Sequence, residues 1–155
     1  MKIFLLTHER ELHRATNTGS IALDNASEFV ERIVWERVNP NKDLLRLIEN
    51  NEAVLLYSKG ESSSTESSAD IAAYENVIII DATWQESKKI FNHSQYLQDA
   101  RHITLKTANE SVYKLRANQP RGGLCTIECI IDVLKVKGQN KIASELLTKF
   151  EQFNG

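Results

Sequence analysis

The stretch "VIIIDATWQESKKIF", Val77–Phe91, decides the fold. A run of apolar, β-branched residues ends at Asp81, and the spacing of the apolar residues then changes from that of a strand to that of a helix. Residues 83–86 spell T-x-x-E, the capping box that predicts a helix starting at Trp84. Asp81 therefore lies in a short turn between a buried strand and a helix N-terminus, where it is either a structural residue or a reactive group.

Similar changes of spacing recur along the chain. Strand-like segments occur at 2–8, 29–38, 52–58, 76–81 and 100–106, and helix-like segments at 42–51, 84–94, 124–138 and 140–153. Strands that alternate with helices predict an α/β domain with a mostly parallel sheet flanked by helices. Ligands of such sheets bind outside the carboxyl ends of the strands, which is where Asp81 is expected.

Length and composition indicate one soluble domain over residues 1–155. The chain is 41% hydrophobic and 26% charged, which is ordinary for a globular protein. The polar segment "KGESSSTESSAD", residues 59–70, is expected to form a mobile surface loop. No apolar run approaches the roughly 18 residues of a membrane span, and the N-terminus reads as a first strand rather than a signal, so we expect no membrane partner.

The cysteine and histidine pattern gives no sign of a metal site. Cys125 and Cys129 are four residues apart in a predicted helix, which is neither a redox pair nor half of a zinc site. None of the four histidines has a metal-ligand spacing to another ligand. We expect two small buried side chains in a reducing compartment, a cytoplasmic protein and no metal.

Basic residues are concentrated in the second half of the chain. The window from Asp81 to Arg121 carries seven basic and four acidic residues, whereas the whole chain has a net charge of −2. This window ends in a loop with Arg116, Arg121 and the pair Gly122-Gly123, directly before a predicted helix. Such a loop suits an anionic or heteroaromatic ligand, although the glycines are also explained by a tight turn and the charges by a solvated face. The glycine spacing is not that of a dinucleotide loop or a P-loop.

Four segments together resemble the DTW-domain family. They are "TNTGS" (16–20), "LLYS" (55–58), "DATWQESKKIF" (81–91) and "YKLRANQPRGGLCTIEC" (113–129). The family is named for an Asp-x-Thr-Trp motif, which stands here as Asp81, Thr83 and Trp84. Its members are tRNA-uridine aminocarboxypropyltransferases, which move the 3-amino-3-carboxypropyl group of S-adenosylmethionine onto N3 of a uridine. The resemblance implies a SPOUT-like fold with a trefoil knot, an exception to unknotted topology.

The resemblance also implies roles for individual residues. Asp81 would be the catalytic base that removes the N3 proton, or would orient the amino group of the transferred chain. S-adenosylmethionine, the co-substrate, would be bound by a set of residues around the knot: Leu56, Asp81, Thr83, Trp84, Leu124, Cys125, Thr126 and Glu128. The tRNA phosphates would meet four basic residues: Lys88, Lys89, Arg116 and Arg121.

Three departures from the family pattern keep alternatives open. Many relatives carry a cysteine-rich, zinc-binding segment before the domain, and we expect it to be absent here. Arginine is usual where Ser20 stands, and serine where Cys125 stands. The alternatives are an RNA-binding or regulatory module that keeps the fold without the activity, and an RNA methyltransferase that uses the same co-substrate. The oligomeric state is open, with a monomer favoured.

Overall fold

The described residues of the protein form a five-stranded sheet in which all strands are parallel. The computed structural model describes residues 1–56, 68–103 and 125–155. The strand order is β2-β1-β4-β3-β5. The strands are β1 (Lys2–Thr7), β2 (Val30–Val34), β3 (Ala53–Leu56), β4 (Asn76–Asp81) and β5 (Arg101–Ile103). The predicted α/β class with a mostly parallel sheet is confirmed.

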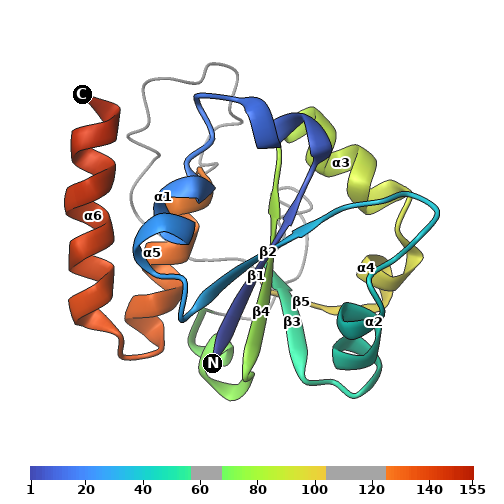
Figure 1. Ribbon diagram of the computed structural model, residues 1–155. Coiled ribbons are helices and arrows are strands. Elements are labelled where there is room, and N and C mark those ends of the chain that lie inside the picture. The colour runs from blue at the N-terminus through green and yellow to red at the C-terminus, as the bar shows by residue number, and fades with distance from the viewer. Residues whose placement is uncertain (57–67, 104–124) are drawn as a thin grey trace.

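Helices cover both faces of the sheet (Figure 1). One face carries α1 (Gly19–Asn25), α5 (Thr126–Val136), α6 (Asn140–Asn154) and the 3-10 helix η2 (Ser68–Ala73). The other carries α2 (Lys42–Glu49), α3 (Trp84–Asn92) and α4 (Gln95–Asp99). Alternate strand residues divide between two apolar clusters: Leu5 and Ile79 pack toward α5, whereas Leu6 and Ile78 pack toward α3. This period of two explains why the central strands are apolar throughout.

The chain leaves the parallel neighbours β1 and β4 in opposite directions across the sheet. From β1 the chain passes through the 3-10 helix η1 (Glu9–His13) and α1 to β2 on one side, whereas β4 leads through α3 and α4 toward β5 on the other. The last residues of these neighbouring strands, Thr7 and Asp81, are paired in register. The carboxyl ends of β1 and β4 thus form a topological switch point, which is where open α/β sheets bind ligands.

Local sequence signals predicted some boundaries of helices and strands correctly and others incorrectly. The helix after Asp81 begins at Trp84, and both hydrogen bonds of the capping box are present. The strand predicted at 29–38 ends at Val34, and α1 and α4 were not predicted. Residues 68–70, at the end of the predicted loop, instead begin η2.

The described ranges limit two further expectations. The trefoil knot stays a prediction, because residues 104–124, which join β5 to α5, lie outside the described residues. Most of the predicted serine-rich loop, residues 59–67, lies outside them as well. Within the described parts of the chain, no helix combines the length and the apolar character needed to cross a membrane.

Candidate functional site

Asp81 is a buried carboxylate at the switch point. It ends the row of β4 side chains that points toward α1 and α5, and only 1% of its surface is exposed. Both carboxylate oxygens accept hydrogen bonds. Oδ1 accepts from Thr126 Oγ1 (2.9 Å), Oδ2 accepts from Thr7 Oγ1 (3.2 Å), and Asn17 Nδ2 donates to both oxygens at 3.0 and 3.1 Å. Asp81 therefore joins β1, the segment before α1 and the start of α5.

The "TNTGS" segment folds around this carboxylate. Asn17 donates to Asp81, and its own side-chain oxygen accepts from the backbone amide of Ser20 at 2.9 Å. A Cβ atom built on Gly19 would lie 2.9 Å from Asp81 Oδ2 and 3.1 Å from Leu5 Cδ1. Glycine is required at this position because the backbone of α1 approaches the carboxylate too closely for a side chain.

The first turn of α5 is fastened to the same place. Thr18 Oγ1 accepts a hydrogen bond from the backbone amide of Ile127 (3.1 Å), and Glu128 accepts one from the amide of Cys125 (3.0 Å). Burial raises the pKa of the Cys125 thiol, and it raises that of Cys129 to about 12. Both thiols are therefore protonated at neutral pH and are poor nucleophiles. No group of histidine, cysteine and acidic side chains within the described ranges could hold a metal ion.

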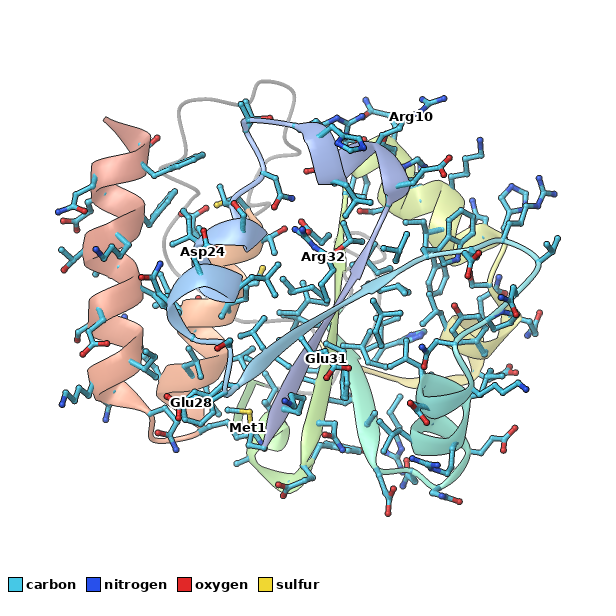
Figure 2. All side chains as sticks on the ribbon, in the orientation of Figure 1. Met1, Arg10, Asp24, Glu28, Glu31 and Arg32 are labelled. Atoms are coloured by element: carbon cyan, nitrogen blue, oxygen red, sulfur yellow. The ribbon has the colours of Figure 1, made fainter. Side chains whose placement is uncertain are left out.

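Arg32 supplies the positive charge at this site. It lies on β2, on the α1 side of the sheet (Figure 2). Its Nε donates to Thr7 Oγ1 at 3.2 Å and its Nη2 to Asn17 Oδ1 at 3.0 Å. The contact between Nη2 and Asp81 Oδ2 is longer, at 3.4 Å, and the side chain is 21% exposed.

A second ionic cluster adjoins the first. Asn17 Nδ2 also donates to the fully buried carboxylate of Glu11, which forms an ion pair with Arg14. Arg14 in turn makes two parallel hydrogen bonds of 2.7 and 2.8 Å to Glu86, the capping-box residue of α3. These bonds to Arg14 lower the pKa of Glu86 to about 2, and Glu86 raises that of Arg14. The segment from Glu11 to Thr18 is thus held against α3 by Arg14, against β4 by Asn17 and against α5 by Thr18.

The structure brings only part of the predicted site together. Thr126 contacts Asp81 directly, Thr83 caps α3 two residues later, and Leu56 ends the strand beside β4. Trp84 begins α3, and the exposed ammonium of Lys88 lies 5.6 Å from its ring centroid. The neighbouring Lys89 is also exposed. Three predicted residues lie outside the described part of the chain: Leu124, Arg116 and Arg121.

Several residues of the cluster were not singled out from the sequence: Thr7, Glu11, Arg14 and Arg32. Asn17 and Gly19 lay within a quoted motif but received no role. A threonine and an arginine at these strand positions give no signal by themselves, because register across three strands brings them to Asp81. On the predicted strand at 29–38 Arg32 shares its row with Glu36, so the pattern of that strand did not mark Arg32 either.

Comparison with known proteins agrees with this arrangement of motifs. The DTW-domain family profile matches residues 1–155. The chain belongs to the DTW-domain family. Among curated proteins, this DTW-domain chain is 24% identical over 154 residues to tRNA-uridine aminocarboxypropyltransferase 2 of Macaca fascicularis, covering 95% of the chain and 51% of that protein. It is 28% identical over 140 residues to the protein of the same name from Drosophila melanogaster, covering 87% of the chain and 55% of that protein.

The DTW-domain chain spans about half the length of the curated relatives it matches. A third relative with the same name, from Mus musculus, is 27% identical over 109 residues, 69% of the chain and 37% of that protein. No solved structure gives a significant match. The family assignment is therefore carried by the sequence profile.

Proposed function

We propose that this DTW-domain protein modifies tRNA by transferring the 3-amino-3-carboxypropyl group of S-adenosylmethionine to N3 of a uridine. One observation carries the proposal: three separate motif segments meet at one carboxylate. Asn17 and Gly19 of "TNTGS", Asp81 of the Asp-x-Thr-Trp motif and Thr126 of "CTIE" are in direct contact at the carboxyl edge of the sheet. The names of the curated relatives support tRNA as the substrate.

The reaction is a displacement at the γ-carbon of the sulfonium. A bond forms between uridine N3 and that carbon, the carbon–sulfur bond breaks, and 5′-methylthioadenosine leaves as a neutral thioether. The proton of N3 passes to a base. Because the leaving group is neutral, the enzyme mainly has to hold the two reactants in line and accept one proton.

Two roles for Asp81 follow from its surroundings. As general base, Asp81 would need a donor, such as the Thr126 hydroxyl, to release Oδ1 when substrate arrives. As a positioning residue, it would keep its partners and hold "TNTGS" and the start of α5 around the substrate. Full occupation of both oxygens and 1% exposure favour the positioning role.

The remaining assignments are part of the same proposal. Leu56, Thr83, Trp84, Cys125, Thr126 and Glu128 would surround the co-substrate, together with Leu124. The ammonium of Lys88 already lies over the ring of Trp84, so the sulfonium of the co-substrate would have to bind on the opposite face of that ring. Lys88 and Lys89 would contact tRNA phosphates, with Arg116 and Arg121. A cytoplasmic location and a monomeric state stay predictions.

The released nucleoside tests the proposal against its alternatives. Purified protein would be incubated with S-adenosylmethionine and unmodified tRNA, and the small products separated by chromatography. Aminocarboxypropyl transfer releases 5′-methylthioadenosine, whereas methyl transfer releases S-adenosylhomocysteine. Product that depends on tRNA and is 5′-methylthioadenosine supports the proposal. S-adenosylhomocysteine would make the protein a methyltransferase, and tRNA binding without either product would make it a binding module.

A further inference from the structure

The guanidinium of Arg32 has two nitrogens committed to the site and one nitrogen, Nη1, open. Its Nε and Nη2 donate to Thr7, Asn17 and Asp81, which are the partners of one side of the planar group. Nη1 makes no hydrogen bond to any residue within the described ranges. Every buried polar side-chain atom in those ranges has a partner, so the open end of Arg32 is reached by solvent, in keeping with its 21% exposure.

The other partly buried arginine of the site is already saturated. Arg14 makes two short parallel bonds to Glu86 and pairs with Glu11 as well. The contact of Arg32 with Asp81 is a single one of 3.4 Å, which is longer than the 2.7–2.9 Å expected of a strong charge-assisted bond. Arg32 is thus a pre-oriented cation whose side chain is held in place by the site itself and whose Nη1 is left to donate.

We infer that the open Nη1 end of Arg32 binds the α-carboxylate of the aminocarboxypropyl chain of S-adenosylmethionine. This inference rests on the proposed function and adds a binding residue to it. Nη1 can donate one hydrogen bond to the carboxylate, and Nη2 can donate a second, parallel one in exchange for its 3.4 Å contact with Asp81; such a pair fixes direction as well as position. With the carboxylate held on Arg32, the chain extends from the switch point and its γ-carbon is presented in a defined direction, as an in-line displacement requires.

Two ligands that differ in the carboxylate test this directly. S-adenosylmethionine and its decarboxylated analogue share the adenosyl, sulfonium and amino groups. Calorimetry would give the affinity of each for the wild-type protein, Arg32→Met, Arg32→Lys and Arg46→Met. Arg46 is an exposed arginine of α2 that pairs with Asp43 of the same helix, so it is a matched control.

We expect the wild type and Arg46→Met to prefer S-adenosylmethionine by about 10-fold or more, since a charge-assisted pair contributes at least that much. In Arg32→Met the preference should fall to nearly one. Arg32→Lys keeps the charge and loses the fork, so its preference should be intermediate. If Arg32→Lys keeps the full wild-type preference, the positive charge alone acts and hydrogen bonding by the guanidinium does not. If Arg32→Met keeps it, Arg32 has no role in binding the carboxylate. Either result overturns the inference.

The controls separate this inference from the proposed function. If the wild type binds neither ligand, the proposed function fails and the inference fails with it. If S-adenosylmethionine binds and the ligand preference does not depend on Arg32, the proposed function stands and the inference is wrong. Circular dichroism melting of each variant establishes that it is folded, and Arg32→Lys gives the decision if Arg32→Met does not fold.

Discussion

Replacing Asp81 by asparagine should cost stability before it costs chemistry. Asparagine has the same shape, but it has no charge and only one oxygen that accepts. Four side chains donate to the carboxylate: Thr7, Asn17, Arg32 and Thr126. The asparagine oxygen can keep the donors at Oδ2, and its amide can donate to the Thr126 hydroxyl, but that amide also faces a second donor, Asn17 Nδ2, so the network is weakened.

The magnitude follows from what is lost. Converting charge-assisted hydrogen bonds into neutral ones, beside a partly buried arginine, should reduce the free energy of unfolding by about 2–3 kcal/mol. For a chain of 155 residues this lowers the melting temperature by roughly 5–10 °C. Asp81→Ala should cost more, about 4–5 kcal/mol, because besides removing the counter-ion of Arg32 it leaves the four donors without any acceptor. Thr126→Val, which removes one donor and keeps the charge, should cost about 1.5 kcal/mol.

Urea unfolding followed by circular dichroism measures these differences, and turnover is then expressed per folded molecule. If Asp81 only positions its neighbours, folded Asp81→Asn should keep part of its activity. If Asp81 is the general base, activity should fall by about 10² or more even in folded protein. An unfolding free energy within ~0.5 kcal/mol of wild type would refute the network argument.

Three further outcomes follow from the same contacts. Gly19→Ala should lower the free energy of unfolding by about 1–3 kcal/mol in urea unfolding, because its methyl group would meet Asp81 and Leu5; a gain in stability, as at an unhindered helix position, would contradict the close approach. Glu86→Gln should cost about 2 kcal/mol at neutral pH, after allowance for the solvent exposure of Arg14. Because the folded pKa of Glu86 is lowered from 4.5 to about 2, this stabilisation exists above about pH 4.5 and is lost as pH falls toward 2, so the difference between the two proteins in urea unfolding should shrink over that range. Lys88→Ala should reduce the slope of log affinity for tRNA against log salt by a little under ~1 unit in filter binding, whereas Lys149→Ala, on α6 across the sheet from α3, should leave it unchanged; equal slopes for both would remove Lys88 from the interface.

The fold was largely readable from sequence because its signals are local. The apolar run into Asp81 and the capping box at Thr83 located both ends of β4 and the start of α3, which ends at Asn92 rather than at residue 94. The end of β2 was misjudged because Trp35 and Val38 are strand-forming residues, yet Val38 is 91% exposed and lies beyond the sheet. The helix α1, only seven residues long, has too little apolar spacing to stand out.

The site was readable only in part, because its contacts are long-range. The motif pointed to Asp81 and Thr126, which are 45 residues apart and in direct contact. The partners Thr7 and Arg32 come from two other strands, and only the parallel register brings them to the carboxylate. The sequence of the predicted strand at 29–38, which carries four charged residues, does not say which of them reaches the carboxylate.

Isotope transfer from S-adenosylmethionine to tRNA is the most direct test of the proposed activity. The protein would be given unmodified tRNA with co-substrate labelled either in the carboxyl carbon or in the methyl group, and the digested nucleosides would be analysed by mass spectrometry. We predict that carboxyl label appears in a modified uridine and that methyl label does not. Methyl label in the nucleoside, or no label from either co-substrate while the protein binds tRNA, would contradict the assignment as an aminocarboxypropyltransferase.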